Sequence, residues 1–244
     1  MRVLVIDSET TGFNDPQAIE IAFILTNYPE LANLAEREIR FRPTKPIDFG
    51  AKAVCHILES ELKDEPEWGG EYYTSTVEYI NSSDYLIGQN IDFDWRVLGS
   101  DIRPKRICTL AIARKLLPEL DSHSQSALMY YFFGDAAKPM IKDAHNALCD
   151  VQNCILVLRE LLKCYINSPL AVSEKQNINT IEDLWLFSEW CRIPDKMTFG
   201  KHKGKTYLEV AKTDPGYFSW WQNKSDTKPD EYQLKAIENA MRSR

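Results

Sequence analysis

Residues 3–12 read VLVIDSETTG, and this stretch decides how the rest of the chain is interpreted. Its apolar start predicts a buried strand, which runs into Asp7 and Glu9 with only Ser8 between them. Alternate residues of a strand share a face, so the two carboxylates are expected side by side. Two like charges this close repel each other unless a cation lies between them. The stretch therefore indicates a cation site at the end of a buried strand.

The composition is that of a globular protein. The chain has 244 residues, 44% hydrophobic and 27% charged, enough for one large domain or a medium and a small one. It contains no membrane-length apolar run, and a carboxylate at residue 7 comes too early for a secretory signal. We therefore expect a cytoplasmic protein with no membrane partner. The six cysteines form no CxxC pair, which favours free thiols over a structural zinc site.

The net charge of −7 argues only weakly against a nucleic-acid partner. A site built from carboxylates makes a chain acidic, and bound cations reverse the sign of the charge locally. Local basic clusters are therefore a better guide to such a partner than the total charge.

The pattern of elements predicts an α/β fold with a mixed central sheet flanked by helices. Residues 2–7, 18–26 and 37–42 have the composition of strands and suggest an antiparallel meander. Further strands then alternate with helices, and residues 144–166 form the longest helical pattern. Strands followed by strand–helix alternation are typical of an α/β layer with a mixed sheet.

The chain is expected to contain two structural units. Residues 1–166 carry the α/β pattern, and residues 167–179 are polar, contain a proline and are interpreted as a linker. Residues 180–244 are rich in Trp and Tyr and are expected to form a small C-terminal domain.

Two more carboxylates and a histidine lie at the edges of buried elements. Asp94 opens a predicted helix, and Asp150 lies early in the longest one, five residues after His145. Each of the three residues also has a purely structural interpretation. Asp94 would be a helix-start carboxylate, although Asp92 is the better candidate for the cap. Asp150 would be a solvated helix residue, and His145 a satisfied core or loop histidine. Together with Asp7 and Glu9 they indicate a site for two Mg²⁺ or Mn²⁺ ions, which prefer oxygen ligands. His145 is expected on the loop before the helix, as general base.

At this point the residues resemble a known family. DSETTG, then N-x-x-F-D at Asn90–Asp94 and H-x-x-x-x-D at His145–Asp150, are similar to the three motifs of the DnaQ-like (DEDDh) 3′→5′ exonucleases. The resemblance implies an RNase H-like fold and two Mg²⁺ ions, with Mn²⁺ as a substitute. It implies that Asp7, Glu9, Asp94 and Asp150 hold these ions and that His145 acts as the base.

The same resemblance implies contacts to the substrate. Thr10, Thr11 and Gly12 would grip the terminal nucleotide, and Asn90 would help to position the strand end. Phe13 would wedge against the terminal base, with ordinary packing as the equal alternative. Ser8 stands where the family usually has threonine, which is expected to be harmless because only the flanking acids bind metal. Gln89 replaces the common histidine, which would alter contacts near the product phosphate or have no effect. A packing role is expected for His56.

The C-terminal part resembles a narrower group. Residues 197–221, MTFGKHKGKTYLEVAKTDPGYFSWW, are similar to the tails of exodeoxyribonuclease X-like enzymes. Lys201, Lys203 and Lys205 alternate around two glycines, which predicts a tight turn or hairpin able to meet successive phosphates. A solvated basic loop is the alternative. Trp220 and Trp221 are expected in the core of the small unit.

The sequence thus predicts a metal-dependent 3′→5′ exonuclease that releases 5′-mononucleotides from the 3′ ends of single- or double-stranded DNA. An RNA-trimming enzyme of the same fold stays open, because discrimination between the two sugars depends on a contact to the 2′-OH. A non-catalytic nucleic-acid-binding module is the third reading.

Overall fold

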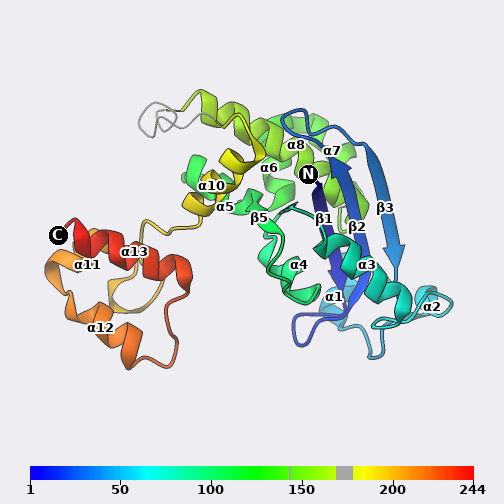
Figure 1. The fold of residues 1–244 in the computed structure, drawn as a ribbon, viewed down its shortest axis with the longest axis horizontal. Helices are drawn as coiled ribbons and strands as arrows, with labels where there is room; N and C mark the ends of the chain where they lie inside the picture. The colour runs from blue at the N-terminus through cyan, green and yellow to red at the C-terminus, as the bar shows by residue number, and fades with distance from the viewer. Residues whose placement is uncertain (143, 169–177) are drawn as a thin grey trace. The chain divides into compact units, whose positions relative to one another are not determined.

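A computed structural model describes residues 1–142, 144–168 and 178–244 (Figure 1). These residues fall into two compact units, unit 1 from Met1 to Ser188 and unit 2 from Glu189 to Arg244. No helix among the described residues is long and apolar enough to cross a membrane. Most of the predicted linker, residues 169–177, lies outside the described residues.

Unit 1 is built on a five-stranded sheet with the order β3-β2-β1-β4-β5 (Figure 1). β1 pairs antiparallel with β2, and β2 antiparallel with β3, whereas β1–β4 and β4–β5 are parallel. The predicted mixed sheet and its antiparallel meander are therefore confirmed. The strands are β1 (Val3–Thr10), β2 (Ala18–Thr26), β3 (Ala35–Arg40), β4 (Tyr85–Gly88) and β5 (Lys105–Cys108).

The sheet of unit 1 is flanked by helices, most of them short. They are α1 (Phe49–Cys55), α2 (Glu59–Leu62), α3 (Glu71–Asn81), α4 (Asp92–Val97), α5 (Thr109–Leu116), α6 (Gln125–Phe133), η1 (Gly134–Ala136), α7 (Ala137–Met140), α8 (Ala147–Ile166) and α10 (Ile181–Cys191). Ser124 caps α6, as expected, by accepting a hydrogen bond from the Ala127 N–H.

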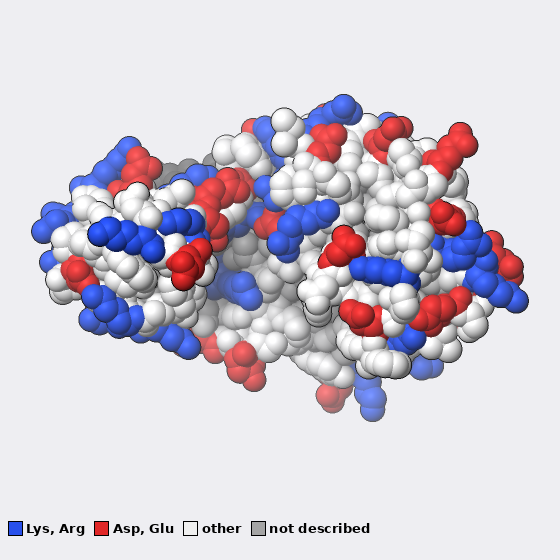
Figure 2. All heavy atoms as spheres, turned by 90° about the horizontal axis from the view of Figure 1, so that it is seen from below, with Lys and Arg blue, Asp and Glu red and all other residues white. Residues whose placement is uncertain are grey.

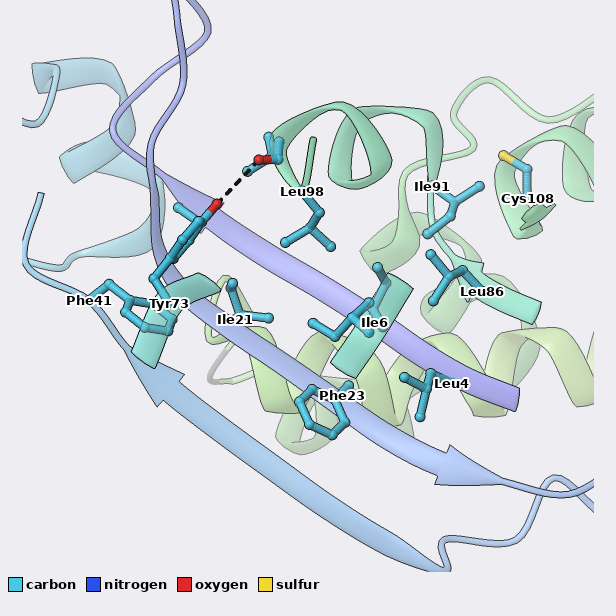
Figure 3. Packing of buried hydrophobic residues seen from close by; sticks show 13 residues of the cluster. Leu4, Ile6, Ile21, Phe23, Phe41, Tyr73, Leu86, Ile91, Leu98 and Cys108 are labelled. Atoms are coloured by element: carbon cyan, nitrogen blue, oxygen red, sulfur yellow. Dashed lines mark hydrogen bonds between the residues drawn. The ribbon is translucent and has the colours of Figure 1, made fainter. Parts of the chain in front are cut away.

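The two faces of β1 have different partners. Leu4 and Ile6 pack into a cluster with Tyr73 and Ile80 of α3 and with neighbouring apolar residues, as Figure 3 shows for several of them. Residues 3, 5, 7 and 9 point to the opposite face, since side chains alternate along a strand. α8 contacts both β1 and β2. The period of the strand therefore directs Asp7 and Glu9 away from the cluster of Figure 3.

The first strand is longer than the sequence predicts. β1 runs to Thr10, so Asp7 and Glu9 lie within the strand, opposite Ala22 and Glu20 of β2, and not at its end. Asp92 is not the cap of α4, because it lies inside the helix and pairs with Arg106. His56 does not pack in a core; it is exposed and ends α1 in a left-handed conformation.

The second unit begins at Glu189, later than the boundary at residue 180 that the sequence predicts. The reason is that α10 packs within unit 1. The Ser188 hydroxyl accepts a hydrogen bond from the Cys108 N–H at 2.8 Å, and the Phe187 ring lies 4.5 Å from the Tyr165 ring. Lys105 of β5 also pairs with Glu182 of α10.

Unit 2 has a small core of its own. Its elements are η2 (Gly200–His202), α11 (Tyr207–Thr213), α12 (Gly216–Asn223) and α13 (Glu231–Arg242). Thr206 and Asp230 cap α11 and α13 with capping boxes. Trp221 is fully buried in the core, as expected, whereas Trp220 is 45% exposed and the expectation that it is a core residue is wrong.

Candidate active site

Four carboxylates from separate parts of the chain meet around the second half of β1, the central strand of the sheet of unit 1. Asp7 and Glu9 come from β1, Asp94 from α4 and Asp150 from the first turn of α8. Asp7, Glu9 and Asp150 line a cavity of about 630 Å³. Asp94 is almost fully buried, 3% exposed, and its carboxylate lies close enough to repel those of Asp7 and Glu9.

Without a cation nearby, the ionised forms of these carboxylates are unfavourable. Burial, aided by repulsion from Asp94, Asp150 and Glu9, raises the pKa of Asp7 well above its usual value. Burial likewise raises the pKa of Glu9 to about 8 and that of Asp94 to about 7. Oxygen donors held this close, and disfavoured as free anions, fit divalent cations.

Ser8 takes part in the site, although the sequence gives it no role. Its hydroxyl donates a hydrogen bond to Asp94 Oδ1 at 2.7 Å. Ser8 points to the opposite face of β1 from Asp7 and Glu9, and this is the face on which α4 packs. The hydrogen bond opposes the effect of burial on the pKa of Asp94 and fixes the rotamer of that carboxylate.

His145 lies on the loop before α8, as predicted. It is exposed and left-handed (φ 70°), and its backbone N–H donates to Asp150 Oδ2 at 2.9 Å. One imidazole nitrogen and one oxygen each from Glu9 and Asp150 lie within 4.8 Å of one another. An imidazole is thus held beside the carboxylates of Glu9 and Asp150. The neighbouring Asp143, expected to cap or pair in this loop, lies outside the described residues.

Asp150 is fixed by a residue that the sequence does not single out. Gln125 of α6 donates from its side-chain amide to both the backbone oxygen and Oδ1 of Asp150, each at 3.0 Å. Nothing in the local pattern marks Gln125, because its partner lies in another helix.

Glu20 of β2 is a further residue, after Ser8 and Gln125, whose role is not evident from the sequence. It is fully buried and pairs with Arg40 of β3 at 2.7 Å. Its second oxygen accepts a hydrogen bond from the Ala147 N–H at 2.9 Å. A single charged residue inside the apolar run AIEIAFILT was the signal that could have found it.

A second, smaller cavity adjoins Glu9. It measures about 210 Å³ and is lined by Ser8, Glu9, Thr10, Gly12, Phe13, Asp48, Gly50, Ala51, Val54 and Phe93. Phe13 is 88% exposed, with its ring 5.9 Å from that of Phe93. Gly12 has φ 145°, a conformation that residues with a side chain rarely adopt, and a Cβ there would also force the Asp48 carboxylate to move.

Two of the predicted substrate residues do not line either cavity. Thr11 is buried, and its hydroxyl accepts a hydrogen bond from the Gln17 N–H at 3.1 Å, which holds the loop after β1. Asn90 is exposed, with φ 61°, at the turn into α4. Gln89 lines the larger cavity, but its amide already bonds the His123 backbone oxygen and the Thr109 hydroxyl.

The remaining predicted residues lie in unit 2. Lys201, Lys203 and Lys205 are exposed in a tight turn closed by hydrogen bonds between the backbones of Met197 and Lys205 and of Gly204 and Met197. The turn contains η2, so the lysines do not alternate along a strand. Lys201 pairs with Asp214 at 2.7 Å.

Residues 4–158, more than half of the chain, match the family model described as "Exonuclease". The chain belongs to this exonuclease family and is a hydrolase. Residues 197–226 match a second model, "Exodeoxyribonuclease X-like C-terminal". The chain is 28% identical to Exodeoxyribonuclease 10 of Escherichia coli K12 over 231 residues, 94% of each chain.

Solved structures support the fold. Exonuclease X in complex with 5′-overhanging duplex DNA is 24% identical, with a TM-score of 0.50, over 68% of this chain and 92% of that one. The zinc-bound E. coli ExoI–ssDNA complex is 17% identical, with a TM-score of 0.57, over 71% of this chain and 42% of that one. The predicted RNase H-like fold is thereby confirmed.

Proposed function

We propose that the chain is a 3′→5′ exodeoxyribonuclease that releases 5′-mononucleotides from DNA ends with two divalent cations, Mg²⁺ or in its place Mn²⁺. The observation that carries this proposal is the meeting of Asp7, Glu9, Asp150 and His145 at one cavity, with the buried Asp94 close enough to repel Asp7 and Glu9. DNA is favoured as substrate because the relative similar over 94% of the chain is named an exodeoxyribonuclease.

The four carboxylates would hold the cations. Bound there, divalent ions would supply Lewis-acid stabilisation of the negative charge that develops on the reacting phosphodiester. The chain's own residues set the geometry: Ser8 orients Asp94 and Gln125 orients Asp150. In this reading the repulsion within β1, between Asp7 and Glu9, is the reason why the site takes up cations.

His145 would act as the general base. An imidazole nitrogen would take the proton from the attacking water, since histidine is the side chain most often used as a general base. The exposed side chain can turn while its backbone N–H stays bonded to Asp150. The leaving 3′ oxygen belongs to the shortened strand, so each cycle releases a 5′-mononucleotide.

The smaller cavity would take the terminal nucleoside. The Phe13 and Phe93 rings offer a base a stacking surface that does not read its sequence. Thr10 lines this cavity, and its hydroxyl donates to the Gly12 backbone oxygen at 3.0 Å, which shapes the wall. Thr11 and Asn90 would act indirectly, by holding the protein loops that surround the 3′ end of the bound DNA.

Cationic side chains would contact the phosphates. Arg114 of α5 is the only Lys or Arg among the described residues that line the larger cavity. Lys201, Lys203 and Lys205 of unit 2 offer further contacts, which position a strand without reading its sequence. We place the enzyme in the cytoplasm, a reducing compartment in which its six free cysteines would stay reduced.

The test is a cleavage assay with DNA and RNA oligonucleotides labelled at the 5′ end. With Mg²⁺ or Mn²⁺ we expect a ladder of DNA products shortened one nucleotide at a time from the 3′ end, and no products with EDTA. A 3′-blocked oligonucleotide should resist cleavage. Shortening from the 5′ end, or faster cleavage of RNA than of DNA, would contradict the proposal.

A further inference from the structure

Unit 2 exposes an aromatic surface next to its basic turn. Trp220 is 45% exposed, whereas Trp221 is fully buried and donates from Nε1 to the Thr227 backbone oxygen at 2.9 Å. The two neighbouring residues of α12 therefore have different environments. Trp221 fills the core, and Trp220 leaves about half of the largest side chain in proteins facing solvent.

Trp220 and Lys201 both lie next to the ring of Tyr217. The Tyr217 ring lies 5.4 Å from the Trp220 ring and is tilted by 34°. The Lys201 ammonium lies 5.4 Å from the centre of the same Tyr217 ring. Tyr217 itself is buried, 7% exposed, so the groups that face solvent are the Trp220 indole and the Lys201 ammonium, which both contact its ring. We call these two side chains the Trp220 platform.

The basic turn is built to bring Lys201 to this place. Gly200 (φ 69°) packs so closely on the Tyr217 hydroxyl that a Cβ would collide with it. Asp214 pairs with Lys201 at 2.7 Å and with His202 Nε2 at 2.9 Å. Because an ammonium has three donors, Lys201 can keep Asp214 and still donate to an oxygen of a ligand.

The charge of unit 2 favours an anionic partner. The whole chain carries a net charge of −7, but residues 189–244 hold eleven Lys and Arg against eight Asp and Glu. Figure 2 shows blue side chains spread over unit 2, and Lys203 and Lys205 are exposed in the same turn as Lys201. An exposed indole beside lysines is the combination that binds a strand with accessible bases.

We propose that the Trp220 platform binds single-stranded nucleic acid, with a base stacked on the Trp220 indole and the adjoining phosphates met by Lys201 and Lys203. This inference rests on the proposed function, in which the bound strand is the substrate. Duplex bases are already stacked on each other, so the platform discriminates in favour of single strands. Stacking accepts every base, as an exonuclease requires.

The test measures binding by the full chain. A fluorescent oligo-dT with phosphorothioate linkages is titrated in EDTA, so that hydrolysis does not interfere, and anisotropy is recorded at several salt concentrations. We expect Trp220→Ala to weaken binding about 5- to 150-fold, the range for loss of one stacked base. Trp220→Phe, which keeps a ring, should stay within about threefold of the wild type.

Matched variants separate stacking from charge. Lys201→Gln should reduce the salt dependence of log K by about one unit of slope. Lys235→Gln, whose contacts are with Tyr232 and Glu189, removes the same charge elsewhere in unit 2 and should have a smaller effect. Leu234→Ala is the control for Trp220, because Leu234 is 42% exposed in the same unit. Trp220→Leu keeps apolar bulk without a ring, and thermal unfolding checks that each variant folds.

Two further readouts decide the proposal. In cleavage of single-stranded DNA, Trp220→Ala should raise KM and leave kcat unchanged, the signature of lost binding. Binding of blunt duplex DNA should not change. The platform proposal would be contradicted if Trp220→Ala bound oligo-dT as tightly as the wild type. It would also be contradicted if the variant lost as much affinity for blunt duplex DNA as for oligo-dT. A wild-type protein that cleaves no free 3′ end would instead overturn the proposed function, so the two failures are distinguishable.

Discussion

The backbone N–H of Ala147 donates a hydrogen bond to Glu20 Oε2 at 2.9 Å, which ties the first residue of α8 to β2. The other oxygen of Glu20 is held by Arg40 at 2.7 Å, and the adjoining Asn146 donates to Glu38 at 2.6 Å. The start of the helix that carries Asp150 is therefore anchored to two strands.

Replacing Glu20 should destabilise the fold. Glu20→Ala leaves the Ala147 N–H and Arg40 without their partner, and loss of hydrogen bonds to a charged group costs about 2–3 kcal/mol. Urea unfolding should show a lower midpoint with an unchanged slope. Glu38→Gln, at the exposed contact to Asn146, is the control and should stay within about 0.5 kcal/mol. A Glu20→Ala protein as stable as the wild type would contradict this role.

His145 can be tested with a control in the same backbone conformation. His145 and His56 both have left-handed φ angles, 70° and 59°, which Asn tolerates. We expect His145→Asn to lower kcat at least ~10²-fold, as for loss of a general base. His56→Asn should keep the wild-type rate, because His56 is exposed at the end of α1. Equal rates in the two variants would remove His145 from the mechanism.

The stability of the metal-free protein should fall as pH rises. Folding raises the pKa of Glu9 from 4.5 to about 8 and that of Asp94 from 3.8 to about 7, chiefly by burial. Between these values the folded state binds more protons than the unfolded state. The stabilisation is therefore complete below pH ~4 and is lost as pH rises through 7 to 8.

Thermal unfolding with EDTA at pH 5, 6, 7 and 8 measures this loss. Mg²⁺ should raise the melting temperature more at pH 8 than at pH 5, because it binds the ionised carboxylates. Asp94→Asn should show a shallower decline with pH than the wild type. A metal-free melting temperature that rises from pH 5 to pH 8 would be incompatible with the buried carboxylate cluster.

The place of α10 predicts how truncations behave. Ending the chain after Ser188 keeps Leu184, Phe187 and the Ser188–Cys108 hydrogen bond, whereas ending it before residue 180 removes them. Residues 1–188 should melt as one cooperative unit, with a shallower salt dependence of DNA binding than the full chain. Residues 1–179 should melt several degrees lower, because three buried apolar side chains, Ile181, Leu184 and Phe187, are lost. Equal melting temperatures would place α10 outside the core.

Much of the site could be predicted because it depends on local periodicity. The two-residue period of β1 brings Asp7 and Glu9 to one face, and the helical pattern that starts after His145 leaves this residue on a loop. Glu20 and Gln125 could not be assigned in the same way. Their partners, Ala147 and Asp150, are more than twenty residues away, and only the tertiary fold brings them together.

The same limit applies to burial. Trp220 and Trp221 look equivalent in sequence, but the helix turns about 100° between them, so only one faces the core. Likewise, the apolar residues of α10 show that the helix is buried on one side, but not against which unit. The fold of unit 1 follows from its pattern, whereas the boundary with unit 2 depends on packing.

The most direct test of the central claim is to locate cations in crystals of the protein grown with Mn²⁺ and a 5′-mononucleotide, by anomalous scattering. If the site holds two cations, we expect two peaks about 3.5–4 Å apart among Asp7, Glu9, Asp94 and Asp150. In Asp94→Asn crystals at least one peak should be lost, together with more than about a hundredfold of the cleavage rate. Wild-type crystals without a peak among these carboxylates, from a preparation that cleaves DNA, would contradict the central claim.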